Sequence, residues 1–434
     1  MAEVSAHAEI RIFGETVGAV AELDNGRVLF EYADSFRGRG LEISPIHLPT
    51  SLRGPIAFDE LRKSQSFDGL PGVLADALPD TFGNRVIRAW FAARGEADRA
   101  LSPVQRLLYV GERALGALSF HPATRIPTRA AEIQSLELAA LVRDARRIVQ
   151  GDPKIAIPEI YRIGASAGGI RPKALIRFEP ATRTIRSANA PPKAGDIPCI
   201  LKFDGVGDGD SADALGRPQP FNRIEAAYTE MARAAGLEAT QITMLEEDGF
   251  AHLLVHRFDV EGAQRRHQHS LGGLIHVDYN MPGASSYEEF LRCILRLGMP
   301  YAGVEQGYLR MLFNVFAVNQ DDHVKNLSFH MDSAGRWRLA PAYDLTFARG
   351  HGFTVHHQMR VNDKVSGIAL SDLLEVGKVF GINDPAALIE RMAAAIARWE
   401  EFAAAAKVPK KDMGRVRVEL DRRARELARG SGPR

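Results

Sequence analysis

The feature that most constrains this chain is a dense polar segment, residues 319–326, that stands between two apolar stretches. It follows an apolar run with helical character at residues 309–318 and precedes the strand-like Leu-Ser-Phe-His of residues 327–330. Polar groups between buried elements need partners, so such a segment usually forms a functional site or a cap. Its sequence is Asn-Gln-Asp-Asp-His-Val-Lys-Asn, and a further aspartate, Asp344, follows in Ala-Tyr-Asp-Leu.

The spacing of these polar residues is typical of phosphoryl transfer. One carboxylate must orient the attacking hydroxyl, while an amide and a second carboxylate hold Mg²⁺ against the phosphates. In protein kinases the base Asp and the metal-binding Asn lie five residues apart on one loop, and the second Asp follows a short hairpin. Asp321 and Asn326 have that spacing, and Asp344 has the right order. Lys325 is placed to neutralise charge on the transferring phosphoryl group. The alternative is that these aspartates are ordinary loop and turn residues.

A lysine within an apolar strand indicates the same chemistry. Lys202 lies in Cys-Ile-Leu-Lys-Phe, residues 199–203, where an unpaired buried ammonium group would be costly. Glu225, on a helix predicted at residues 221–235, is the candidate partner, because kinases hold the α- and β-phosphates with a strand Lys paired to a helix Glu. The alternative is an edge-strand lysine that faces solvent.

A segment of small residues precedes this strand. Residues 164–173 read Gly-Ala-Ser-Ala-Gly-Gly-Ile-Arg-Pro-Lys. Small side chains let backbone N–H groups approach a phosphate closely, and Arg171 and Lys173 add positive charge. The segment matches neither standard glycine-rich phosphate motif, and a plain flexible loop is equally compatible with it.

The order of predicted elements is β-rich first, mixed next and mostly helical last, which favours a bilobal α+β fold with a cleft between the lobes. The length of 434 residues suits two or three domains. We expect a β-rich N-terminal subdomain at residues 1–130, an N lobe at 131–265 and a helical C lobe at 266–434. The main predicted helices are residues 85–94, 136–149, 221–235, 287–297, 304–319, 384–406 and 412–429, and the main predicted strands are residues 9–13, 17–23, 27–32, 174–178, 200–203, 241–245 and 250–258.

Composition excludes several classes of protein. The formal net charge of +1 does not indicate a nucleic-acid binder. The two cysteines, Cys199 and Cys293, form no CxxC pattern, so a disulfide framework and a thiolate zinc site are not expected. We find no leader-like N-terminus and no apolar run of membrane-spanning length, so we expect a cytoplasmic protein without a membrane partner.

Nearly the whole chain resembles the HipA family of bacterial serine/threonine kinase toxins, which have a distant protein-kinase-like fold. The most specific match is Asp-x-His-x-Lys-Asn at residues 321–326, followed by Tyr343-Asp344. Val-His-Arg-Phe-Asp at residues 255–259 resembles the hinge strand that meets adenine. Residues 14–18, 30–32 and the Asp-Ala-Leu-Pro-Asp of 76–80 resemble the N-terminal subdomain of the family.

The resemblance implies ATP and Mg²⁺ as cofactors. It implies Asp321 as the base, assisted by Lys325, and Asn326 and Asp344 as metal ligands. It also implies autophosphorylation at Ser166. The loop and the hinge depart from the family pattern: the loop reads Ala-Gly-Gly-Ile-Arg-Pro-Lys, and His256 replaces an acidic residue, so only a backbone contact to adenine would persist there. The implied ATP-binding residues are Gly168, Gly169, Ile170, Arg171, Pro172, Lys173, Lys202, Glu225, His256, Phe258, His323, Asn326, Tyr343 and Asp344.

In function, the resemblance implies a toxin that phosphorylates a cytosolic protein, with aminoacyl-tRNA synthetases among the targets known in the family. It implies a small helix-turn-helix, HipB-like antitoxin as partner, with DNA contacted through that complex. Residues 410–429 are rich in Lys and Arg, which fits a solvated helix face or a DNA contact. Two other functions remain open: a small-molecule kinase, and a catalytically silent regulatory or DNA-associated binding module.

Overall fold

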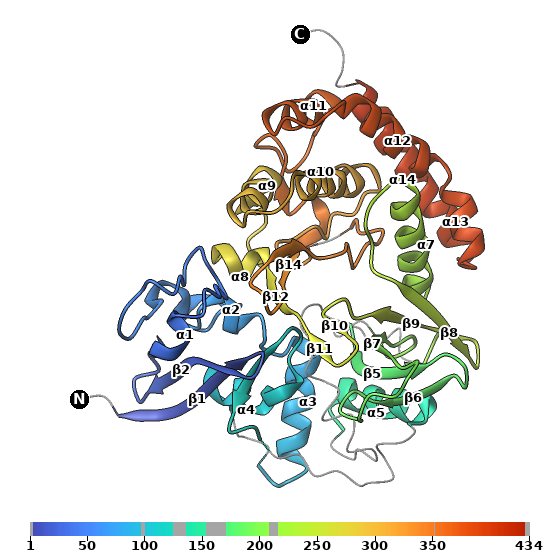
Figure 1. The fold of residues 1–434 in the computed structure, drawn as a ribbon. Helices are drawn as coiled ribbons and strands as arrows, with labels where there is room; N and C mark the ends of the chain where they lie inside the picture. Colours follow the sequence, from blue (N-terminus) through green and yellow to red (C-terminus); the bar gives the residue numbers. More distant parts are fainter. Residues whose placement is uncertain are drawn as a thin grey trace.

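The computed structural model describes residues 3–96, 100–124, 136–152, 171–207, 216–350 and 352–429. It confirms an α+β architecture that is β-rich at its beginning and mostly helical at its end (Figure 1). Figure 1 shows three parts: an N-terminal β-rich unit, a five-stranded sheet, and a helical C-terminal lobe. Residues from all three parts line one cleft. No helix in these ranges is long and apolar enough to cross a membrane.

The N-terminal unit is a four-stranded antiparallel sheet in the order β3-β2-β1-β4. Apolar side chains of the strands alternate toward a core that contains Ile10, Val20 and Phe30. Gly18 is required where β2 meets β3, since a Cβ there would lie 2.1 Å from the Glu31 carbonyl oxygen. The elements are β1 (Val4–Ile12), β2 (Glu15–Leu23), β3 (Val28–Tyr32), α1 (Asp34–Arg37), the 3-10 turn Asp59–Lys63, α2 (Gly72–Ala75), α3 (Thr81–Ala92), α4 (Pro103–Val110), the 3-10 turn Gly111–Arg113 and β4 (Leu118–His121).

Helix α3 leaves the N-terminal unit and packs elsewhere. Asp80 caps its N-terminus by accepting a hydrogen bond from the Gly83 N–H at 2.6 Å. Its apolar face, which includes Val86 and Trp90, belongs to the core beneath the five-stranded sheet. The predicted division at residue 130 therefore does not coincide with a division between cores, because α3 ties the first segment to the second.

The second part is the antiparallel sheet β6-β5-β7-β9-β8. The predicted strands at residues 174–178, 200–203, 241–245 and 250–258 all lie in it, each with slightly different ends. Lys173 and Lys202 stand directly opposite each other on β5 and β7. The elements are α5 (Leu138–Gln150), β5 (Lys173–Glu179), β6 (Thr184–Ser187), β7 (Ile197–Lys202), α7 (Phe221–Ala234), β8 (Ile242–Glu247) and β9 (Phe250–His256).

The C-terminal lobe contains the predicted helices and also small strands, of which the sequence indicated β14 as the strand-like residues 327–330. Strand β14 is the middle strand of the sheet β12-β14-β15 and directly follows the polar segment 319–326, whose Lys325 and Asn326 line the cleft. The elements are β10 (Val260–Glu261), β11 (Gln264–Arg265), β12 (His267–Ser270), α8 (Leu271–Ile275), β13 (Ser285–Ser286), α9 (Tyr287–Arg296), α10 (Tyr301–Phe316), β14 (Ser328–Met331), β15 (Trp337–Leu339), the 3-10 turn Gly352–Val355, β16 (Met359–Arg360), α11 (Leu370–Val379), α12 (Pro385–Ala397), α13 (Trp399–Ala405) and α14 (Lys410–Arg429).

Two helix predictions in this lobe were wrong in extent. Residues 384–406 form two helices, because the chain turns at Arg398 so that Trp399 is buried against Tyr228, with ring centroids 5.4 Å apart. The indole N–H of Trp399 then donates to the Met413 carbonyl at 3.0 Å. The helix predicted to residue 319 ends at Phe316, and Val318 has a left-handed backbone.

A close contact joins the N-terminal unit to the C-terminal lobe. We call it the seam: Gly72 and Asp76 against His269, Ser270 and Gly273. A Cβ on Gly72 would lie 1.9 Å from the Gly273 carbonyl oxygen, so only glycine permits this approach. The Asp76 carboxylate accepts from His269 Nδ1 at 2.7 Å, from the Ser270 N–H at 2.7 Å and from the Ser270 hydroxyl at 2.6 Å.

Candidate active site

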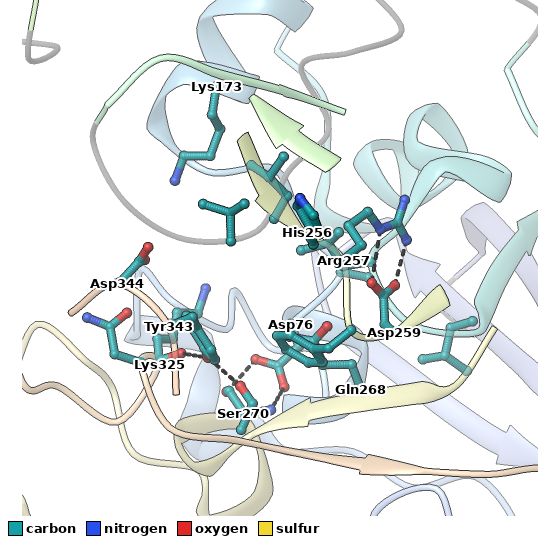
Figure 2. Close-up of a pocket in the computed structure, with 18 of the residues that line it drawn as sticks. Asp76, Lys173, His256, Arg257, Asp259, Gln268, Ser270, Lys325, Tyr343 and Asp344 are labelled. Atoms are coloured by element: carbon teal, nitrogen blue, oxygen red, sulfur yellow. Dashed lines mark hydrogen bonds and ion pairs between the residues drawn. The ribbon is translucent and has the colours of Figure 1, made fainter. Parts of the chain in front are cut away.

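The cleft between the five-stranded sheet and the C-terminal lobe holds eight of the seventeen predicted site residues (Figure 2). Its empty space is about 950 Å³. Lys173, Lys325 and Asp344 lie at one end, which we call the charged end, whereas Arg257, Asp259 and Gln268 lie at the other (Figure 2). Apolar side chains also line the cleft: Val73, Ala77, Leu115, Leu118, Ile200 and Val255. This mixture suits a ligand with an aromatic base and a charged tail. The predicted residues that line the cleft are Lys173, Lys202, His256, Phe258, Lys325, Asn326, Tyr343 and Asp344.

Lys202 is buried and has the predicted partner. Its ammonium group pairs with the Glu225 carboxylate at 2.5 Å and also bonds to Asp344. Burial raises the pKa of Glu225, and the nearby Lys202 charge opposes that rise. Burial would lower the pKa of Lys202, but Asp344 and Glu225 outweigh it and raise that pKa. The edge-strand alternative for Lys202 is therefore wrong.

Asp344 reaches Lys202 from an unusual backbone conformation. Its φ is 52°, in the left-handed region that aspartate tolerates better than most residues. Burial would raise its pKa, but the charges of Lys202 and Lys173 hold the pKa of Asp344 at about 2. The carboxylate is therefore ionised at neutral pH and stands among the lysines of the cleft.

Asp321 is positioned by a residue that the sequence did not single out. Its side chain is 44% exposed, and one carboxylate oxygen accepts from the Gln358 side-chain amide at 2.9 Å. The neighbouring Asp322 is buried and accepts from His357 Nδ1 at 2.9 Å and from the Gln358 N–H at 2.8 Å. Asp322 thus fixes the segment that carries Gln358, and Gln358 in turn restrains Asp321. No local pattern near residue 358 indicated this role.

The rest of the polar segment forms a tight loop. The Asn326 amide donates to the Asp321 carbonyl at 2.8 Å, so the two ends of the motif meet. The Tyr343 hydroxyl donates to the Lys325 carbonyl at 2.7 Å, which ties the loop to the strand before Asp344. Lys325 lies 5.1 Å from the centre of the Tyr279 ring. His323 borders a second cavity rather than the cleft itself.

At the hinge, the two predicted adenine-contacting residues differ. The His256 N–H donates to the Gln241 carbonyl at 2.8 Å, and its carbonyl accepts from the Thr240 hydroxyl at 2.8 Å. In the parts of the chain that the structure describes, Phe258 shows no such backbone hydrogen bond. Its ring stacks on Tyr343 at 5.8 Å. Phe258 therefore offers a backbone contact to a bound base more readily than His256 does.

Other predicted residues lie around a second, open cavity of about 720 Å³ that shares Lys173, Lys202, Lys325 and Asp344 with the cleft. Asp321, His323, Glu225 and Arg171 border this cavity. Arg171 also lies over the Phe221 ring at 4.1 Å, and the Pro172 carbonyl accepts from the Phe203 N–H at 3.2 Å. Ser166, Gly168, Gly169 and Ile170 lie outside the described residues.

One further carboxylate, which the sequence did not connect with the site, is Asp80. It lies 3.4 Å from the Lys173 ammonium group and borders the second cavity. Burial raises the pKa of Asp80, whereas the Lys173 charge and the Gly83 N–H oppose that rise.

The residues present fit a magnesium nucleotide. Within the described ranges no group of three or more His, Cys, Asp or Glu side chains could hold a metal by itself. Asn326 and Asp344 supply two oxygen ligands at the charged end of the cleft. Mg²⁺ characteristically takes one or two protein ligands and completes its shell with phosphates and water.

Comparisons with known proteins agree with this geometry. The model of the HipA-like C-terminal domain matches residues 165–416, and that of the HipA N-terminal domain matches residues 8–121. Among solved structures, the HipA, HipB and operator DNA complex of the Shewanella oneidensis MR-1 toxin–antitoxin system matches with a TM-score of 0.64 and 16% identity, covering 97% of this chain and 96% of that one. The Helicobacter pylori proinflammatory kinase CtkA matches with a TM-score of 0.33 and 11% identity, over 53% of this chain and 88% of that one, too low to indicate a shared fold. No curated protein sequence matches significantly.

Proposed function

The chain belongs to the HipA family, and from this premise we propose that it is an ATP- and Mg²⁺-dependent serine/threonine protein kinase that acts as the toxin of a toxin–antitoxin pair. The observation that carries the proposal is the grouping of Lys202, Asp321 and Asp344 around the second cavity, which shares Lys202 and Asp344 with the cleft. These are the residue types that positioning and electrostatic catalysis of phosphoryl transfer require.

Each side chain has a role that follows from its surroundings. Glu225 orients Lys202 toward the α- and β-phosphates of the nucleotide, as a buried strand–helix pair does in kinases. Asn326 and Asp344 would hold Mg²⁺, which would supply charge neutralisation at the phosphates. To serve as a ligand, Asp344 would have to give up its bond with Lys202. Lys325 faces the developing charge on the transferred group.

Asp321 accepts the proton of the attacking hydroxyl. Its partial exposure lets a substrate reach it from the second cavity, while Gln358 keeps one carboxylate oxygen in place. The other oxygen takes no part in that bond and would act as the proton acceptor. The apolar side chains of the cleft take the adenine, with Phe258 and Tyr343 beside it.

The openness of the second cavity favours a protein substrate over a small alcohol. Its volume is about 720 Å³, and it shares Lys325 and Asp344 with the cleft. We further propose autophosphorylation at Ser166 and a HipB-like partner through which DNA is contacted. The Shewanella complex, which contains HipA, HipB and operator DNA, supports the partner assignment.

The test is a comparison of substrates. Purified protein is incubated with labelled ATP and Mg²⁺, either with a bacterial lysate or with a panel of small alcohols and aminoglycosides. We expect labelled protein bands, including the chain itself, and no labelled small molecule. Labelling confined to the small-molecule panel would identify a small-molecule kinase. Absence of ATP binding by calorimetry would indicate a silent binding module.

A further inference from the structure

Two lysines stand side by side at the charged end of the cleft. Lys173 and Lys202 are directly opposed residues on antiparallel strands, so their side chains project from the same face of the sheet. Like charges at directly opposed positions repel each other, and both side chains are almost fully buried. Each ammonium group therefore needs a carboxylate of its own.

The two carboxylates come from different parts of the molecule. Lys202 is paired with Glu225, which lies on α7 within the same lobe. Lys173 is paired with Asp80, which precedes α3 and lies inside the segment that matches the HipA N-terminal domain, residues 8–121. The side chains of Lys173 and Asp80 are only 6% and 2% exposed, so solvent screens this ion pair little.

We infer that Asp80 is a positioning residue of the phosphate site: it holds Lys173 beside Lys202, and the N-terminal domain thereby completes the nucleotide site of the C-terminal domain. The inference rests on the proposed ATP binding. Asp80 is thus the counterion of Lys173, as Glu225 is the counterion of Lys202.

The position of Asp344 gives the pair a consequence for the metal. Lys173 is close enough to Asp344 for its charge to lower the pKa of that carboxylate. Without Asp80, the Lys173 ammonium group would be attracted by Asp344, which lines the same cleft. If Lys173 bonded to Asp344, it would compete with Mg²⁺ for that carboxylate. Its ammonium group would also no longer lie beside Lys202, where we propose that the phosphates bind.

The seam holds Asp80 at the right distance. Asp76, four residues earlier, is fixed by His269 and Ser270 on the C-terminal lobe, and Asp80 itself is fixed by capping α3. The short segment 76–80 is therefore anchored at both ends, and it crosses from the core of the N-terminal unit to that beneath the five-stranded sheet.

Capping and pairing can be separated by one substitution. Asparagine caps helices about as well as aspartate, so Asp80→Asn keeps the hydrogen bond from the Gly83 N–H and removes only the charge that faces Lys173. The matched control is Asp59→Asn, which removes an exposed carboxylate paired with Arg27 in the same N-terminal unit.

The experiment measures Mg·ATP affinity by calorimetry on the full chain, with thermal unfolding of every variant. We expect Asp80→Asn to weaken binding about tenfold, Asp80→Glu to recover part of the loss, and Asp59→Asn to bind as the wild type does. In a cycle with Lys173→Met, Asp80→Asn should cost much less affinity in the Lys173→Met background than in the wild type, because Asp80 acts on the nucleotide through Lys173.

Several outcomes would overturn the inference. A folded Asp80→Asn variant with wild-type or tighter affinity contradicts it, and so does a double variant whose loss is the product of both single losses. If Asp80→Asn alone does not fold, recovery of folding in the double variant supports the pair and continued misfolding contradicts it. A wild-type protein that binds no Mg·ATP would instead overturn the proposed function.

Discussion

The two junctions that enclose the active site are built from opposite chemistry. The seam joins the N-terminal unit to the C-terminal lobe through a direct contact of Gly72 with Gly273 and a carboxylate, Asp76, that is fully hydrogen-bonded. The cleft, which Asp76 and Ser270 of the seam also border, is lined by lysines and carboxylates whose bonds would have to rearrange for the proposed nucleotide to bind. A close backbone contact fixes one arrangement, whereas exchangeable ion pairs permit two.

From this comparison we infer that the seam fixes the N-terminal unit relative to the C-terminal lobe, whereas the cleft carries out the proposed reaction. Substitutions in the seam should change stability before they change catalysis. Substitutions in the cleft should change catalysis with little effect on folding. The following predictions test that separation, starting from the largest expected effect.

Removal of the proposed base, Asp321, should cause the largest loss of phosphoryl transfer. Asp321→Asn keeps the size of the side chain but removes the proton acceptor, so phosphoryl transfer should fall about 10²–10⁴-fold. Mg·ATP affinity and the melting temperature should remain near wild type, because Asp321 is partly exposed and is not a metal ligand. The control is Asp248→Asn, an exposed residue at the turn between β8 and β9. Wild-type transfer by Asp321→Asn would contradict the base assignment.

The junction beside the seam should be the acid-sensitive one. Burial lowers the pKa of His267 to about 3, and its ring bonds to the Ile43 carbonyl at 2.8 Å across the same two parts of the molecule. Because the unfolded chain takes up the proton near pH 6.5 and the folded chain does not, stability should fall as the pH drops from about 6.5 toward 3. This histidine alone should contribute about 1.4 kcal/mol per pH unit.

The measurement is denaturant unfolding at several pH values between 7 and 4. His267→Gln keeps a donor for the Ile43 carbonyl but does not titrate, so it should show a shallower loss of stability with acid. The exposed His356→Gln variant is the control. An unchanged slope in His267→Gln would show that His267 is not a source of the acid sensitivity.

The seam has no room for even one added methyl group at Gly72. Gly72→Ala would place a Cβ 1.9 Å from the Gly273 carbonyl oxygen, so the two segments must move apart. We expect a loss of about 1–3 kcal/mol in the free energy of unfolding, typical of overpacking. Gly38→Ala is the matched control, because nothing lies within 4 Å of its added Cβ. Equal stabilities of the two variants would mean that the two segments of the seam move apart without a loss of stability, which contradicts the prediction.

The smallest predicted effect concerns the positioning of the base. Gln358→Ala removes the amide that holds Asp321, so kcat should fall about tenfold, or about 1.4 kcal/mol, while the KM for ATP should stay unchanged. Steady-state kinetics of autophosphorylation measures both values, and exposed His356→Ala is the control. A rise in KM with an unchanged kcat would place Gln358 in nucleotide binding instead.

The sequence by itself indicated the family and the α+β class, and its local motifs predicted the residues that we propose carry the chemistry. Asp321, Asn326 and Asp344 were recognisable because phosphoryl transfer imposes a fixed spacing on one loop and the strand after it. Glu225 was recognisable because a buried lysine must have a partner and the next helix offered one. These inferences depend on residues that are near neighbours in the chain or follow a fixed order.

Only the tertiary structure decided which distant residues support them. Gln358 reaches Asp321 because its own N–H group is bound by the neighbouring Asp322. Asp80 reaches Lys173 because the seam anchors residues 76–80. The break between α12 and α13 likewise follows from the burial of Trp399 against Tyr228, which helix propensities of the neighbouring residues do not predict. Partners that are separated by tens or hundreds of residues leave no periodic or spacing signal in a single sequence, because packing alone brings them together.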